Sequence, residues 1–228
     1  MSDAEVTIEE LTVGDRPDAW AEAGFSVDPD GTCTIGAVRV RLVGAETGRG
    51  ILGWKLAGPG LSPTLDQIDG LPTTASTTAS TTEQAATATS ATAHPNGVAG
   101  LDHVVLISSD GERTAAALTG STGLAVRRVR ETTSYGAPMR QWFFRAGPVI
   151  IELVAPDDGD GASPTGFFGL AMNVDDIDAL PGIYGDALSG PKDAVQPGRR
   201  IASLRHKQLH MSVPVAFMTP EPGAAPPN

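Results

Sequence analysis

The stretch LDHVVLISSDGERTAAALTGSTGLAVRRVRETTSYGAPMRQWFFRAGPVIIELVAP, residues 101–156, decides the fold of this chain. It predicts a strand, a short helix that begins after Asp110, and then three strands, because apolar and alternating segments surround a run of small, helix-compatible residues. One ionisable residue stands in each of two otherwise apolar strands, His103 in the first and Glu152 in the last. Glutamate is depleted in strands and carboxylates are rarely buried without a partner, so this pair is the candidate for chemistry.

Two other parts of the chain predict the same order of elements. Residues 167–219 indicate a strand, a short helix, a hairpin and a closing strand, and residues 6–56 indicate a strand, a short helix and further strands. Repetition on this scale is typical of duplicated modules. The expected fold class is therefore α+β, built from βαβββ modules.

Composition excludes several classes of protein. A formal net charge of −11 argues against a nucleic-acid partner, because a basic footprint is missing. No apolar run approaches the roughly 20 residues that cross a bilayer, and the acidic N-terminus does not resemble a signal peptide. The single cysteine, Cys33, excludes an internal disulfide. We expect a cytoplasmic protein with no membrane segment.

One tract differs from the rest. Residues 73–93 are almost wholly Thr, Ala and Ser, and Glu83 is their only charge. Without bulky apolar side chains, such a tract has nothing to offset the entropy lost on ordering, so it is expected to be a flexible linker that is dispensable for folding.

A histidine on the first strand and a glutamate on the last strand of a βαβββ unit make the chain resemble the vicinal oxygen chelate superfamily, which includes glyoxalases, bleomycin-resistance proteins and dioxygenases. The resemblance implies that two modules pair into a U-shaped sheet and that their first and last strands hold one divalent metal. His103 and Glu152 would then be metal ligands. This donor pair suits iron, manganese, zinc, nickel or cobalt without choosing among them. Without a metal, Glu152 remains the candidate catalytic residue, as a general base paired with His103.

The resemblance also sets the expected organisation of the chain. We expect the chain to comprise an N-terminal βαβββ-like module over residues 1–60, the Thr/Ala/Ser-rich linker over residues 61–97, a glyoxalase-like domain over residues 98–222 and a disordered tail over residues 223–228. The extra module leaves an open sheet edge, which would be covered by the same chain or by a second copy in a homodimer.

The other modules depart from the metal-binding pattern. Alignment places Gly169 opposite His103 and Ala216 opposite Glu152, and Lys55 stands near the glutamate position of the first module. A third ligand would have to come from elsewhere; the candidates are His94, His206 and His210. The alternative is that these are ordinary solvated loop histidines.

Three further residues are candidates for substrate binding. Arg199 and Arg200 follow a Pro-Gly turn. Since neighbouring strand residues point to opposite faces, only one of the two can face the trough enclosed by the U-shaped sheet and bind an anionic group there. The other interpretation is a surface salt bridge. Trp142 is either part of the core or a wall of the pocket.

Two functions remain open at this point. The first is an enzyme in which a divalent metal polarises a substrate oxygen. The second is a metal-free protein that binds a small molecule, as bleomycin-resistance proteins do. The His103–Glu152 pair favours the first, and Gly169 and Ala216 favour the second.

Overall fold

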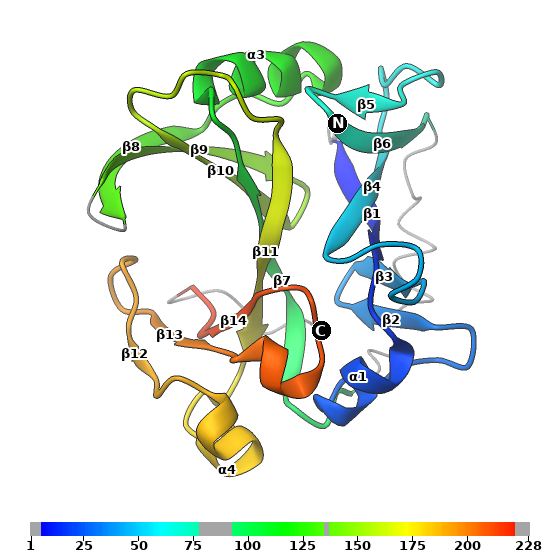
Figure 1. Cartoon of the computed structure of the whole chain (residues 1–228), viewed down its shortest axis with the longest axis vertical. Coiled ribbons are helices and arrows are strands. Elements are labelled where there is room, and N and C mark those ends of the chain that lie inside the picture. Colours follow the sequence, from blue (N-terminus) through cyan, green and yellow to red (C-terminus); the bar gives the residue numbers. More distant parts are fainter. Residues whose placement is uncertain (1–5, 78–92, 135–136, 222–228) are drawn as a thin grey trace, which may run out of the picture.

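The computed structural model describes residues 6–77, 93–134 and 137–221. Within these residues the chain forms one six-stranded and one eight-stranded sheet. Figure 1 shows the N-terminal sheet standing beside the middle strands of a strongly curled C-terminal sheet. Strands dominate and helices are short, so the expected α+β class is confirmed. None of the helices in the described residues is long and apolar enough to cross a membrane.

The C-terminal sheet has the strand order β12-β13-β14-β11-β7-β10-β9-β8. Its strands are β7 (Val98–Ile107), β8 (Arg128–Ser134), β9 (Ala137–Ala146), β10 (Val149–Pro156), β11 (Gly166–Val174), β12 (Lys192–Asp193), β13 (Arg200–Ser203) and β14 (Val215–Met218). In each module the first strand runs parallel to the last, β7 to β10 and β11 to β14. The antiparallel pair β7–β11 joins the two modules into one sheet, which is the pairing that the resemblance implied.

The longest helix, α3 (Gly111–Thr122), begins where the sequence predicts, directly after Asp110. The Asp110 carboxylate accepts a hydrogen bond from the backbone N–H of Arg113, and Gly123 closes the helix in the left-handed conformation. Gly111 lies against the sheet, where a Cβ would come within 2.2 Å of the Trp142 ring. The second module carries α4 (Leu180–Tyr184) and the 3-10 helices η1 (Gly185–Ala187) and η2 (His206–Leu209).

The N-terminal sheet has the order β2-β3-β1-β4-β6-β5 and a plan that the sequence did not reveal. Its elements are β1 (Thr7–Val13), α1 (Pro17–Glu22), β2 (Thr32–Ile35), β3 (Val38–Leu42), β4 (Ile51–Ala57), β5 (Gln67–Ile68) and β6 (Leu71–Ser76). Strand β4 was expected to close the first module, but it pairs antiparallel with β1 and parallel with β6. The pair β1–β4 therefore corresponds to β7–β11, and this sheet is a shortened version of two paired modules. Alternation identifies a strand but not its partner, which is why the sequence did not reveal this plan.

Part of the expected linker is structured. Strands β5 and β6 lie within residues 61–97, and β6 includes Thr73, the start of the Thr/Ala/Ser tract. Thr73 is buried, and its hydroxyl is satisfied there because it accepts a hydrogen bond from the Trp54 indole, with Nε1 2.8 Å from Oγ1. The start of the tract is therefore ordered by a hydrogen bond to a small hydroxyl group, without the bulky apolar side chains that we expected ordering to require. Residues 78–92 of the expected linker and the tail over residues 223–228 lie outside the described residues.

Side chains from both sheets meet in one continuous core. Trp54 of β4 and Phe167 of β11 pack edge to face, with ring centroids 5.2 Å apart. On the turn between β5 and β6, Asp69 accepts hydrogen bonds from the hydroxyls of Thr114 and Thr165. These contacts fix the N-terminal sheet to α3 and to the residues just before β11.

Candidate functional site

A β-bulge in β7 shapes the candidate site. His103 pairs with Ala171 and Leu101 pairs with Met172, so Asp102 has no partner in the register. A bulge re-aims the side chains around it. Here the carboxylate of Asp102 reaches the neighbouring imidazole, with Oδ2 2.8 Å from His103 Nδ1, although strict alternation would place the two side chains on opposite faces.

His103 and Glu152 face each other across β7 and β10. The register pairs His103 with Ile150 and Glu152 with Val105, which places both side chains on the same face of the sheet. His103 Nε2 lies 3.2 Å from Glu152 Oε2, and the side chains are 11% and 13% exposed. The approach expected from the sequence is confirmed. A neutral imidazole carries one N–H, so contacts to two carboxylates need a second proton on the imidazole or on a carboxyl group.

Behind His103, Asp102 is held by a buried arginine. Arg199, 3% exposed, places Nη2 2.6 Å from Asp102 Oδ1. It also donates to Asn173 Oδ1 at 2.9 Å and to the carbonyl oxygen of Thr219 at 2.7 Å. Burial alone would raise the pKa of Asp102, but hydrogen bonds from His103 and Arg199 outweigh burial and lower the pKa to about 2. Asp102 is therefore a carboxylate at neutral pH.

On the far side, Glu152 is held by an amide. Gln141 Nε2 donates to Glu152 Oε1 at 2.6 Å, and Arg130 donates to Gln141 Oε1 through both Nε, at 2.7 Å, and Nη2. The guanidinium of Arg130 also lies over the ring of Phe143, 5.8 Å from its centroid. Six side chains thus form one line of polar contacts, Arg199–Asp102–His103–Glu152–Gln141–Arg130, which we call the polar chain; its links are hydrogen bonds except for the ion-pair contact between His103 and Glu152.

The polar chain lies on what we call the trough face, the face of the C-terminal sheet opposite α3. Large apolar side chains flank it. Ile107, two strand periods from His103, is 45% exposed. Phe168 is 47% exposed and follows Phe167, which points to the other side toward Trp54. Exposed apolar side chains beside a nearly buried ionisable pair are the usual composition of a small-molecule site.

The opposite module contributes no metal ligand to this face. A Cβ at Gly169 would lie 2.6 Å from the carbonyl oxygen of Pro214, so the backbone itself occupies the space of a side chain. Ala171 pairs with both His103 and Ala216, and neither alanine carries a donor atom. Where the resemblance implied two further ligands, the sheet presents methyl groups and a glycine.

The remaining histidines do not complete a ligand set. His94 is buried against the N-terminal half of the chain, where Nδ1 accepts from the backbone N–H of Ser26 and Nε2 lies 3.0 Å from the carbonyl oxygen of Thr34. His206 begins η2, and His210 lines a cavity beside Arg16. Across the described residues no group of three His, Cys, Asp or Glu side chains is placed to hold a metal ion. The donors present therefore do not fit the divalent metal that the resemblance implied.

The substrate-binding candidates are placed as follows. Arg199 belongs to the polar chain and is occupied by Asp102. Arg200 is exposed and places Nη1 2.6 Å from Asp178 Oδ2, the salt bridge that the sequence left open. Trp142 is buried under α3, so core packing, the other interpretation, describes its position.

The sequence analysis missed Asp102, Gln141 and Arg130. Strand alternation gave a usable signal for Gln141, because it shares a face with Phe143, the residue opposite Glu152. Alternation gave the opposite signal for Asp102, because a bulge cannot be read from spacing.

Comparison with known proteins agrees with this architecture. Residues 102–182 match the model of the Glyoxalase/Bleomycin resistance protein/Dioxygenase superfamily, the superfamily that the sequence resembles. A mutant of 4-hydroxymandelate synthase from Streptomyces coelicolor is similar over 97% of this chain and 93% of its own, with 16% sequence identity and a TM-score of 0.60. At that identity the likeness shows the fold alone.

Methylmalonyl-CoA epimerase from Mycobacterium tuberculosis is 21% identical, with coverage of 55% of this chain and 91% of its own and a TM-score of 0.44. The search of curated proteins found no match.

Proposed function

We propose that the trough face binds a small organic molecule and that the polar chain, without a metal, provides the polar centre of the site. The observation that carries this proposal is the His103–Glu152 contact, nearly buried yet flanked by the exposed side chains of Ile107 and Phe168. Ionisable groups beside open apolar surface are arranged to meet a ligand with a polar and an apolar part.

The expected ligand follows from these contacts. Its apolar part would cover Ile107 and Phe168. Its polar part would approach Glu152, a hydrogen-bond acceptor, and Arg130, which donates two hydrogen bonds to the uncharged Gln141. A small aromatic or branched amide, alcohol or carboxylic acid meets these requirements.

Two features support a site that works without a metal. First, Gly169, Ala171 and Ala216 supply no donors from the second module. Second, both nitrogens of His103 already face carboxylates, and Glu152 already has two partners. Coordination of a cation would break the hydrogen bonds that now hold His103 and Glu152 in place, and the cation would gain only these two side chains as ligands.

Ligand-observed NMR with a library of small amides, alcohols and carboxylic acids tests this function. Compounds that bind the wild-type protein should lose binding in Ile107→Lys, which puts a charge on the apolar wall, and in Glu152→Gln, which changes the acceptor. The matched control is Lys55→Met on the N-terminal sheet, which should keep binding. Binding that survives both trough-face variants, or no binding by any compound, would refute the proposal.

A second function is favoured by the contact between Asp102 and His103. A carboxylate that orients an imidazole is the arrangement of a general base, and the pair with Glu152 would let a proton move along the trough face. Bound compounds with a C–H bond next to a carbonyl group should then exchange that hydrogen for deuterium in D₂O. His103→Gln should abolish the exchange while binding persists; compounds that bind without exchange would leave binding as the function.

A further inference from the structure

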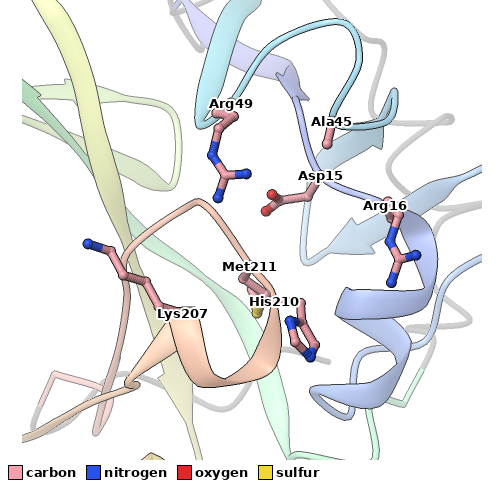
Figure 2. Close-up of a pocket in the computed structure, with 7 residues that line it drawn as sticks. All are labelled: Asp15, Arg16, Ala45, Arg49, Lys207, His210 and Met211. Carbon is pink, nitrogen blue, oxygen red and sulfur yellow. The ribbon is translucent and has the colours of Figure 1, made fainter.

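A cavity lies where the two halves of the chain meet, formed by residues outside the polar chain (Figure 2). Its volume is about 390 Å³. The walls come from the start of α1, from the loop before β4 and from η2 with the residues after it. This volume is within the range of sites for small molecules.

Basic side chains surround this cavity. Arg16 and Arg49 come from the N-terminal half, and Lys207 and His210 come from the C-terminal half. None of the ion pairs among the described residues includes Arg16, Arg49 or Lys207. In a chain with 27 acidic and 16 basic residues, three unpaired permanent cations around one cavity call for a counter-charge.

One carboxylate, Asp15, lines the cavity, and it does not supply that counter-charge. It is buried, its Oδ2 accepts from Trp20 Nε1 at 3.0 Å, and its Oδ1 accepts from the backbone N–H of Ser212 at 2.8 Å. Against this single negative charge stand Arg16, Arg49 and Lys207, so the cavity carries a net positive charge of at least two. The exposed acids nearest in sequence, Asp18 and Glu46, are not among the lining residues.

The floor of the cavity is held rigid by hydrogen bonds between the halves. Besides the bond to Asp15, the Ser212 hydroxyl accepts from the backbone N–H of Gly50 at 2.6 Å. Figure 2 shows the guanidinium of Arg49 facing Asp15, with Arg16 and His210 on the other side of Asp15 and the Lys207 side chain pointing away from these residues. A floor fixed by hydrogen bonds, with exposed cations around it, needs little backbone ordering to hold an oxyanion.

We propose that this cavity binds a small dianion, a phosphate monoester or a dicarboxylate, between the two halves of the chain. Arginine forms paired hydrogen bonds with the oxygens of either group, and Arg16 and Arg49 are the side chains that would do so. Because the ligand would contact both halves, it would stabilise their association as well as fill the cavity. The proposal is independent of the function of the trough face.

Isothermal titration calorimetry at constant ionic strength tests it, with inorganic phosphate, glycerol 3-phosphate and succinate as probes and glycerol as the neutral comparison. The wild-type protein should bind at least one dianion in a saturable way and should not bind glycerol. Binding of the two phosphates alone would assign the site to phosphate monoesters, and binding of succinate alone would assign it to dicarboxylates.

Variants locate the binding. Arg16→Gln and Arg49→Gln should each weaken binding about tenfold or more, because a charged hydrogen bond is lost. Lys192→Gln removes the same charge elsewhere on the surface and should change binding less than twofold, and Glu152→Gln should leave it unchanged. Absence of dianion binding, or equal weakening in Arg49→Gln and Lys192→Gln, would overturn the proposal.

Discussion

The two sheets share a strand plan but differ in how they treat charge. Each has an antiparallel central pair, β1–β4 or β7–β11, with parallel strands beside it. On the N-terminal sheet the charges form an open lattice in which Glu9 and Glu10 pair with Arg39, Arg41 and Lys55, and the basic side chains are 38–51% exposed. On the C-terminal sheet the charges of the polar chain next to His103 are nearly buried.

The difference teaches that the strand plan alone does not make a site. Among the residues that the structure describes, the N-terminal sheet has no counterpart of the outer strands β8 and β12, and its paired basic side chains stay in water. Exposed ion pairs contribute about 0–1 kcal/mol each and are screened by salt. Burial makes an ion pair sensitive to the loss of either partner and makes its groups available for selective binding.

Breaking the buried ion pair should have the largest effect. Arg199→Met leaves the Asp102 carboxylate buried without its main partner, which should cost about 3–5 kcal/mol of unfolding free energy. Arg41→Met on the N-terminal sheet removes an exposed partner of Glu10 and should cost at most about 1 kcal/mol. Urea unfolding at pH 7 measures both, and similar costs for the two variants would contradict the contrast between the sheets.

The edge of the N-terminal sheet gives the next effect. Thr73→Val keeps the shape of the side chain but leaves the Trp54 N–H without its acceptor, which should cost about 1–3 kcal/mol. Thr74→Val, at the next and exposed position, should change stability by no more than about 0.5 kcal/mol. Thermal unfolding of the two variants compares them; equal melting temperatures would mean that the tract from Thr73 onward contributes nothing to the fold.

The smallest effect concerns pH and the contact between the halves. Burial, the largest influence, lowers the pKa of His94 from its usual 6.5, and its hydrogen bond to Thr34 opposes burial only in part. Protonation of Nδ1 would also lose the hydrogen bond from Ser26. The unfolded chain therefore binds more protons below pH 6.5, so stability is full above that pH and falls as the pH drops toward the folded pKa.

The variant His94→Asn separates this contribution from others. Burial and then Lys207 lower the pKa of His206 as well, so the wild-type profile contains both histidines. Urea unfolding at pH 7.5 and pH 5.5 should give a smaller loss of stability for His94→Asn than for the wild type. An identical loss would assign the pH dependence to groups other than His94.

The sequence predicted the parts of the fold that depend on local pattern. The pattern placed His103 and Glu152 on one face of the same module, and Asp110 marked the start of α3. The sequence did not predict the features that depend on residues far apart in the chain. The role of β4 is set by pairing with β1 and β6, and the order at Thr73 is set by the indole of Trp54.

The same limit explains the incomplete view of the site. A bulge, which the spacing of residues does not reveal, brings Asp102 to His103. Arg199, which binds Asp102, lies 97 residues further along the chain. Gly169 and Ala216 did carry a readable signal, because a residue without a donor atom excludes coordination wherever it lies.

Elemental analysis tests whether the trough face binds a divalent metal. Untagged wild-type protein and His103→Ala would be incubated in turn with iron(II), manganese, nickel, cobalt and zinc, desalted, and assayed for metal per chain. We expect no stoichiometric metal in the wild type and no difference between the two proteins. One equivalent of any metal in the wild type that is lost in His103→Ala would contradict it.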